Sequence, residues 1–415
     1  MKVHLRTFGC RANHYDSEQL RAMFGRADVE VVETAGDADV AVFNSCAVTA
    51  DAEADLRQAV RRAARERPGL RSVITGCAAA RSSSALQALP SVEAVLPGAA
   101  LAEVATALGL PPAVVVGTAE AQRGARGLLR VQDGCDEHCT FCATTLARGA
   151  HRSRSSDALV KEARELATHH AEIVLTGVHV GSWGKELGST LGALLERLVR
   201  DVPSARFRLA SVEATEVDAQ LAALLRAGGD RVCPYLHAPL QSGSDRVLKR
   251  MGRHWYTADA YRDAIERLTR DRPVFGLGAD IVCGFPGETD ADHEATLRLV
   301  RALPFTHLHV FPFSPRPGTA AERLDAAVPS DVARERAAQV RALGDAKAAA
   351  YRVSRAGGPA QVVVIQGGAS RQGLTEDYLS VRLQGAASAI PRGARFHARL
   401  QAGEAGGLDA EPVSS

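Results

Sequence analysis

Residues 127–142 read GLLRVQDGCDEHCTFC, a short apolar run that leads directly into three cysteines. Three residues separate Cys135 from Cys139, and two separate Cys139 from Cys142. The whole chain has only eight cysteines in 415 residues. Cysteines crowded behind a strand-like run predict a ligand site at the carboxyl end of a strand.

Downstream of this stretch, apolar runs alternate with helical patterns. The runs are EIVLTG, RFRLAS, PYLHAPL, GADIVCGF and HLHVFPF, beginning at residues 172, 206, 234, 278 and 307. Together with the run at 127 they make six βα units, which predict a central partial (β/α)6 TIM-like barrel over residues 121–348. The active site of such a barrel lies at the carboxyl ends of its strands.

Upstream, residues 1–110 also alternate short buried runs with helices of ten residues or more. This pattern predicts an N-terminal open parallel-sheet α/β domain. Three of its strands end in Cys10, Cys46 and Cys77. Because ligands bind outside the carboxyl ends of parallel strands, these cysteines could meet at one edge. The Pro, Gly and Arg mixture at 111–128 predicts a linker.

The last part of the chain changes pattern again. Short strand-like runs with Gly-rich turns predict a C-terminal small β-barrel over residues 350–402. We expect the tail at 403–415 to be disordered.

Composition limits the class of protein. A net charge of +2 excludes a molecule that is basic throughout, so a nucleic-acid surface has to be a local patch. There is no apolar run of 18 residues and no signal-peptide pattern, so we expect a cytoplasmic protein without a membrane segment. In that reducing compartment clustered cysteines indicate metal binding or catalysis rather than disulfides.

The triplet at 135–142 fits some metal groups better than others. Structural zinc takes four ligands in paired spacings, and no second pair lies nearby. Three thiolates from one loop suit a four-iron cube with one iron left open for another ligand. A buried structural cluster or a zinc knuckle is the alternative.

The same triplet, with Phe141 before its last cysteine, closely resembles the radical S-adenosylmethionine enzymes. That resemblance implies a 4Fe-4S cluster on Cys135, Cys139 and Cys142 whose open iron binds S-adenosylmethionine. It also implies that Phe141 packs near the adenine. Taken without their sequence context, the other three cysteines are more often core residues than ligands. Their contexts TFGCRANHYDSE, FNSCAVTADAE and ITGCAA resemble the methylthiotransferase amino-terminal domain, where such cysteines hold a second 4Fe-4S cluster.

The resemblance continues along the chain, through VLTGVHVGSWG, LASVEATEV, DIVCGFPGETDADHEATLRLV and LHVFPFSPRPGT, and the last domain resembles a TRAM domain. TGVHVGSWG and GLTEDYLSVRL are most similar to the MtaB-type threonylcarbamoyladenosine tRNA methylthiotransferases. The resemblance implies radical methylthiolation at C2 of N6-threonylcarbamoyladenosine 37, with the tRNA anticodon stem-loop and an electron donor protein as partners. The same chemistry on isopentenyladenosine 37 or a ribosomal-protein aspartate is one alternative, and a non-catalytic iron-sulfur RNA-binding or redox-sensing protein is another.

Other residues could complete the site. Small and polar residues at predicted strand ends could bind S-adenosylmethionine, or could be turn and capping residues; they are Gly177, Ser211, Glu213, Gln241 and Gly284. We expect His179, His237 and His309 to be hydrogen-bonded core histidines, and Cys233 and Cys283 to be core thiols.

RNA contacts are expected in the last domain. Between 352 and 401 there are seven arginines and two acids, a net charge of +5. Arginine is the preferred forked donor to phosphate, although a solvated basic face is the alternative. The predicted RNA-binding residues are Arg352, Arg355, Arg371, Arg382, Arg392, Arg395 and Arg399.

Overall fold

In the computed structural model, residues 1–46, 50–98, 101–115, 122–367 and 371–413 are described. They form two compact units. The first comprises Met1–Arg123, Gln132–Glu137 and Cys142–Arg152, and the second Gly124–Val131, His138–Phe141 and Ser153–Ser415. The cysteine loop at 135–142 is therefore divided, because Cys139 belongs to the second unit.

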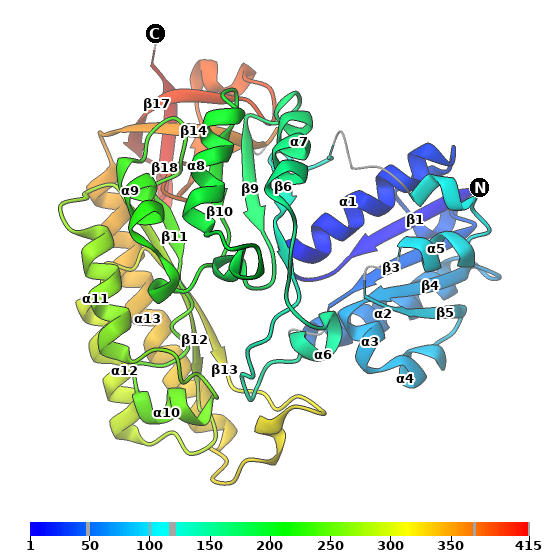
Figure 1. Cartoon of the computed structure of the whole chain (residues 1–415), viewed down its shortest axis with the longest axis horizontal. Helices are drawn as coiled ribbons and strands as arrows, with labels where there is room; N and C mark the ends of the chain where they lie inside the picture. Colours follow the sequence, from blue (N-terminus) through cyan, green and yellow to red (C-terminus); the bar gives the residue numbers. More distant parts are fainter. Residues whose placement is uncertain (47–49, 99–100, 116–121, 368–370, 414–415) are drawn as a thin grey trace. The chain divides into compact units, whose positions relative to one another are not determined.

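The first unit is built on a parallel sheet in the order β2-β1-β3-β4-β5. The strands are β1 (Lys2–Thr7), β2 (Glu30–Val32), β3 (Val40–Ser45), β4 (Arg71–Gly76) and β5 (Val92–Pro97). The helices are α1 (Arg11–Arg26), α2 (Ala50–Glu66), α3 (Cys77–Arg81), α4 (Ser83–Gln87) and α5 (Leu101–Ala107). The predicted N-terminal fold is confirmed (Figure 1).

Strand β3 lies in the middle of that sheet and all six of its residues are buried. Alternate side chains point to opposite faces of a strand. Ala41 and Phe43 join one hydrophobic cluster, and Val40 and Val42 join another. Both faces are therefore covered, which explains why the strand reads as a continuous apolar run.

The second unit contains the predicted barrel. Its strands are β6 (Gly127–Arg130), β9 (Glu172–Thr176), β10 (Arg206–Leu209), β11 (Tyr235–His237), β12 (Gly276–Cys283) and β13 (His307–Pro312). They form two parallel sheets, β10-β9-β6 and β11-β12-β13. Parallel bridges at Phe207–Val232 and Ser211–His237 connect them. The six-stranded partial barrel is thus present as expected.

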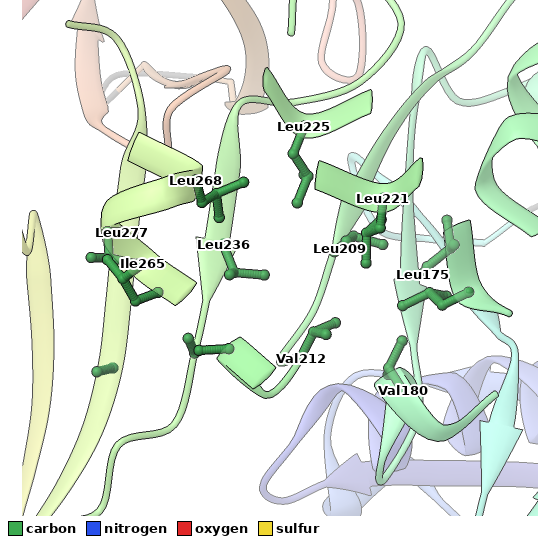
Figure 2. Close-up of a cluster of buried hydrophobic side chains, with 14 of the residues drawn as sticks. Leu175, Val180, Leu209, Val212, Leu221, Leu225, Leu236, Ile265, Leu268 and Leu277 are labelled. Carbon is green, nitrogen blue, oxygen red and sulfur yellow. The ribbon is translucent and has the colours of Figure 1, made fainter. Parts of the chain in front are cut away.

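Helices pack around these strands. They are α7 (Ser156–Ala167), α8 (Leu191–Asp201), α9 (Ala219–Ala227), α10 (Asp245–Arg250), α11 (Ala258–Thr269) and α12 (Asp290–Ala302). Each begins after a Ser, Thr or Asp whose side chain accepts a backbone N–H of the first turn. Between strands and helices lies the main hydrophobic core, which includes Leu175, Leu209, Leu236 and Leu277 (Figure 2).

The long helix α13 (Ser330–Arg355) packs on β12 and β13 and leads into the C-terminal barrel (Figure 1). The predicted domain boundary at 348–350 falls inside this helix. The closed barrel has the order β14-β15-β16-β18-β17. Its strands are β14 (Pro359–Gln366), β15 (Gln372–Thr375), β16 (Ser380–Leu383), β17 (Arg395–Ala402) and β18 (Leu408–Pro412).

The predicted disordered tail is wrong for residues 408–412. Strand β18 pairs with both β16 and β17 and closes the barrel, with Leu408 and Ala410 buried in its core. The strand was not predictable from its sequence, because it contains Asp, Glu and Pro and lies next to glycines. Its stability comes from pairing with neighbouring strands rather than from its own composition.

Short elements complete the cysteine loop: β7 (Gln132–Asp133), α6 (Thr144–Arg148) and β8 (Arg152–Ser153). The predicted linker at 111–128 includes residues 116–121, which lie outside the described residues. Within the part of the chain that the structure describes, no helix is long and apolar enough to cross a membrane.

Candidate metal centres and active site

Cys10, Cys46 and Cys77 each follow a neighbouring strand of the N-terminal sheet. Cys10 is the N-cap of α1, Cys46 directly follows β3, and Cys77 opens α3 directly after β4. Because β1, β3 and β4 are adjacent and parallel, their carboxyl ends share one edge of the sheet. The strand prediction that brings the three cysteines to that edge is confirmed.

Glycines make room around these thiols. Gly9 has a φ of +89°, and a Cβ there would lie 2.3 Å from the sulfur of Cys46. Gly76 has a φ of +93°, and its Cβ would lie 2.4 Å from the carbonyl oxygen of Ser45. Only glycine permits both the left-handed conformation and the close approach. A glycine directly before Cys10 and Cys77 was a usable sequence signal.

Asn13 holds two of the strand-end loops together. Its side-chain amide donates to the carbonyl oxygens of Phe8 at 2.9 Å and Ser45 at 2.7 Å. The backbone carbonyl of Asn13 in turn accepts from Asn44 at 2.7 Å. Since Asn13 is fully buried, these bonds fix the loops before Cys10 and Cys46.

A buried arginine lies beside Cys77. Arg148 of α6 donates to the side-chain oxygens of Asn13 and Asp16, each at 2.7 Å, and to Asp133 at 3.1 Å. Burial raises the pKa of the Cys77 thiol to about 11, and Arg148 opposes that rise. A cation at this position favours a thiolate or another anionic group.

The second triplet occupies the loop after β6. Gly134 has a φ of +71°, and a Cβ there would lie 1.9 Å from the carbonyl oxygen of Ala150. The Cys135 amide donates to the carbonyl oxygen of Gly149 at 3.1 Å. The sulfur of Cys142 accepts the amide of Thr144 at 3.3 Å. Hydrogen bonds to cysteine sulfur are typical of iron-sulfur sites.

Cys139 receives a cationic donor from the barrel. Nη1 of Arg253 lies 3.5 Å from the sulfur of Cys139, and Nε donates to the hydroxyl of Tyr256 at 2.9 Å. Arg253 also pairs with Glu213, whose second oxygen accepts from Trp255 at 2.9 Å. Arg253 is only 5% exposed, so its guanidinium is fixed beside the sulfur.

Comparisons with known proteins bear on these two sites. The family models that match are the uncharacterized protein family UPF0004 over residues 2–98 and the radical SAM superfamily over residues 129–300. The threonylcarbamoyladenosine tRNA methylthiotransferase MtaB of Thermotoga maritima is 36% identical over 80% of each chain. The protein of that name from Aquifex aeolicus is 32% identical over 93% of this chain and 97% of its own.

The chain belongs to the radical S-adenosylmethionine methylthiotransferase family, within the MtaB group. The resemblance drawn from the motifs is thereby confirmed. Among solved structures, the radical S-adenosylmethionine methyltransferase TsrM of Kitasatospora setae aligns with a TM-score of 0.57 at 17% identity. The alignment covers 77% of this chain and 76% of TsrM, and it supports the fold alone.

In this methylthiotransferase, the residues predicted to bind S-adenosylmethionine follow strands β9 to β12. Gly177 follows β9, Ser211 and Glu213 follow β10, and Gln241 follows β11 with a φ of +63°. Gly284 follows β12, but a Cβ there would lie 2.3 Å from the Cβ of Ala333. Packing against α13 therefore already accounts for that glycine.

Phe141 packs edge-on against Phe285, with ring centroids 6.3 Å apart. It borders a small cluster with Met251 and Ala321. Phe141 is half-buried. Sequence reasoning missed Arg148 and Arg253, because each lies far along the chain from some of the groups that it binds.

The prediction of an RNA contact is wrong for Arg355. This side chain is 3% exposed and donates to Asp377 at 2.7 Å and Glu376 at 3.0 Å. It holds the turn between β15 and β16, so it cannot reach a phosphate. Arg382 is exposed but pairs with Asp409 and Glu404.

The other predicted arginines are partly or fully exposed, and four of them donate to backbone carbonyl oxygens: Arg352 to Gly406, Arg392 to Ile365, Arg395 to Asp230 and Arg399 to Gly357. Arg371 is partly buried. Strand β18 and the turn before it also bring in Glu404, Asp409 and Glu411. The charge excess therefore falls from +5 over residues 352–401 to +2 over residues 352–412.

Proposed function

We propose that this chain is a tRNA methylthiotransferase that installs a methylthio group at C2 of N6-threonylcarbamoyladenosine 37. The relatives that carry this substrate in their names support the choice of base. The observation that carries the proposal is the pair of cysteine triplets, which follow strands of two different parallel sheets and use six of the eight cysteines.

We infer two 4Fe-4S clusters and S-adenosylmethionine as the cofactors. Cys135, Cys139 and Cys142 would hold the first cluster, and Cys10, Cys46 and Cys77 the second. Such groups supply the electron and the radical that activate a C–H bond, and the sulfur that is transferred. The protein holds these groups, orients the base and excludes water.

Two buried arginines assist the thiolates in this proposal. Arg253 donates toward the sulfur of Cys139, and Glu213 and Tyr256 hold its guanidinium in place. Arg148 lies beside Cys77, held by Asp16 and Asp133. Each places a fixed positive charge where an anionic cluster would bind.

The substrate and partners follow from the same proposal. The closed C-terminal barrel serves as a TRAM-like domain that binds the anticodon stem-loop, and its exposed arginines Arg392 and Arg399 contact phosphates. An electron donor protein would supply the electron to a cluster held by Cys135, Cys139 and Cys142. A tRNA substrate places the enzyme in the cytoplasm.

Nucleoside mass spectrometry of tRNA from cells with and without this gene tests the proposal. We expect loss of 2-methylthio-N6-threonylcarbamoyladenosine and accumulation of its unthiolated precursor. Loss of the methylthio form of isopentenyladenosine instead would reassign the substrate. An unchanged profile would reject tRNA as the acceptor, and the ribosomal protein would then be examined.

A further inference from the structure

Two histidines and an aspartate converge in the barrel and belong to neither cysteine triplet. His237 lies on β11, Asp280 on β12 and His309 on β13, which are neighbouring parallel strands. Asp280 pairs in register with His309, and His237 with Gly278, two residues before Asp280. Because side chains alternate along a strand, all three project from one face of the sheet.

The distances between the candidate ligand atoms suit one metal ion. Oδ1 of Asp280 lies 3.1 Å from Nε2 of His237 and 3.2 Å from Nδ1 of His309. All three ligand atoms lie within 4.8 Å of one another. Bonds of about 2.1 Å to one ion separate neighbouring ligands by about 3.0 Å in octahedral and about 3.4 Å in tetrahedral geometry.

Strand β12 lies between the two strands that carry the histidines, and its Gly278 leaves room for imidazole rings. A Cβ at Gly278 would lie 2.6 Å from Nδ1 of His237 and 2.1 Å from Nε2 of His307. Any larger residue would displace these rings, so the glycine keeps His237 in place. His237 is 5% exposed and therefore has little freedom to turn away from Asp280.

The carboxylate of Asp280 lies between the two imidazoles, with Oδ1 facing a ring nitrogen of each. A carboxylate in this position supplies the negative charge that a divalent cation requires.

We propose that His237, Asp280 and His309 bind one divalent transition-metal ion of the zinc or ferrous type. Two imidazoles and one carboxylate form the ligand set that both ions accept, and three protein ligands leave coordination positions open. The side chain of His309 is 57% exposed, so solvent or a small oxygen ligand reaches these positions. The ligands of this site belong to neither cysteine triplet.

Zinc is the suitable probe, because added iron would be confused with cluster iron. The full-length protein, with its clusters assembled anaerobically, is dialysed against zinc at low concentration. Zinc, iron and sulfide per chain are then measured together with the X-ray absorption spectrum at the zinc edge. We expect one zinc per chain with a nitrogen and oxygen ligand shell that includes imidazole.

Two conservative variants remove ligands without removing the fold. Asp280→Asn keeps the shape of the side chain, and His309→Gln changes a largely exposed residue. Each should weaken zinc binding at least about tenfold with unchanged iron and sulfide content. His169→Gln, which removes an exposed histidine at the end of α7, is the control and should bind zinc like the wild type.

Two results would overturn the proposal. A sulfur ligand shell with unchanged zinc in Asp280→Asn would assign the metal to cysteines. No bound zinc in the wild-type protein would leave a hydrogen-bonded triad and no metal site.

Discussion

At the level of single residues, each cysteine triplet has one buried arginine beside one of its sulfurs. Arg148 lies beside Cys77, and Arg253 lies beside Cys139. Each guanidinium is held by at least one carboxylate, which fixes its direction and offsets the cost of its burial. Charge and hydrogen bonds around the sulfurs set the reduction potential of an iron-sulfur cluster.

Arg253→Gln should therefore lower the reduction potential of the first cluster without preventing its assembly. The variant loses a positive charge and its hydrogen bond to the sulfur of Cys139. We expect a shift of about 60 mV, which corresponds to a tenfold change in a one-electron equilibrium. A redox titration followed by electron paramagnetic resonance measures it.

Lys249→Gln is the matched control for that shift, because it removes one exposed charge from the nearby helix α10. Its potential should equal that of the wild type. Equal potentials in Arg253→Gln and the wild type would mean that Arg253 only supports the fold around Glu213 and Tyr256.

Substitutions in the two cysteine triplets should abolish different steps of the reaction. Cys139→Ala removes a ligand of the first proposed cluster, so reduction with dithionite should yield no 5′-deoxyadenosine. Cys46→Ala should still cleave S-adenosylmethionine but should add no methylthio group to tRNA. Each variant is the other's control, measured by chromatography of the nucleoside products. Wild-type methylthiolation by Cys46→Ala would contradict the assignment of the second cluster.

At the level of elements, the loop after β6 depends on Gly134. In Gly134→Ala, the new residue would have to adopt a positive φ, and its Cβ would lie 1.9 Å from the carbonyl oxygen of Ala150. Gly149→Ala would also require a positive φ, of +71°. The nearest atom to its Cβ outside the adjacent residues, however, is Nη1 of Arg152 at 3.8 Å, which is ordinary van der Waals contact. We expect a cost of about 1–3 kcal/mol for Gly149→Ala from conformation alone, because its φ of +71° and ψ of −160° are open almost only to glycine, and a larger cost plus loss of iron for Gly134→Ala.

Urea denaturation and iron analysis of the two variants measure this difference. Similar stabilities and similar iron contents would show that the close approach between Gly134 and Ala150 relaxes readily.

The order of these elements could be read from the sequence, but some of their contacts could not. Strands β1, β3 and β4 are six-residue runs that are each followed by a helix, so the shared edge of Cys10, Cys46 and Cys77 was predictable. Strands β2, β5, β15 and β18 have three to six residues and were missed. Arg253 and Cys139 are 114 residues apart, and no local pattern joins them.

At the level of the whole second unit, the C-terminal barrel packs against the amino ends of the strands in the α/β barrel. Arg206 and Arg208 alternate along β10 like an exposed face, yet both are fully buried and pair with Glu172 of β9. Arg208 also donates to the carbonyl oxygens of Thr375 and Glu376. These contacts join the two barrels at the end of the strands opposite the candidate active site.

Arg208→Met should therefore destabilise the protein by about 3–5 kcal/mol. The variant leaves the buried Glu172 with one fewer cation and removes the arginine donor to the carbonyl oxygen of Glu376. Arg200→Met, on the exposed side of α8, removes a surface partner of Asp201 and should cost less than about 1 kcal/mol. Urea denaturation compares them. An equal effect of both substitutions would show that the buried network adds little to stability.

The buried ion pairs of Arg206 and Arg208 with Glu172 also limit which variants can test RNA binding. Deleting the C-terminal barrel would expose Arg206 and Arg208, so lost binding could not be separated from lost folding. The double variant Arg392→Gln with Arg399→Gln changes only exposed side chains that bind backbone carbonyls. Phosphate contacts release counterions, so each lost contact reduces the salt slope of tRNA binding by about 1.

We therefore expect weaker tRNA binding at low salt and a salt slope reduced by about 2, measured by filter binding across a salt series. The control removes one exposed and one partly exposed charge elsewhere, Arg200→Gln with Arg262→Gln on α8 and α11. Because net charge falls equally in both, a general loss of positive charge would lower both slopes alike. That result would reject the C-terminal barrel as the RNA surface, whereas a change confined to the first variant would locate phosphate contacts on it.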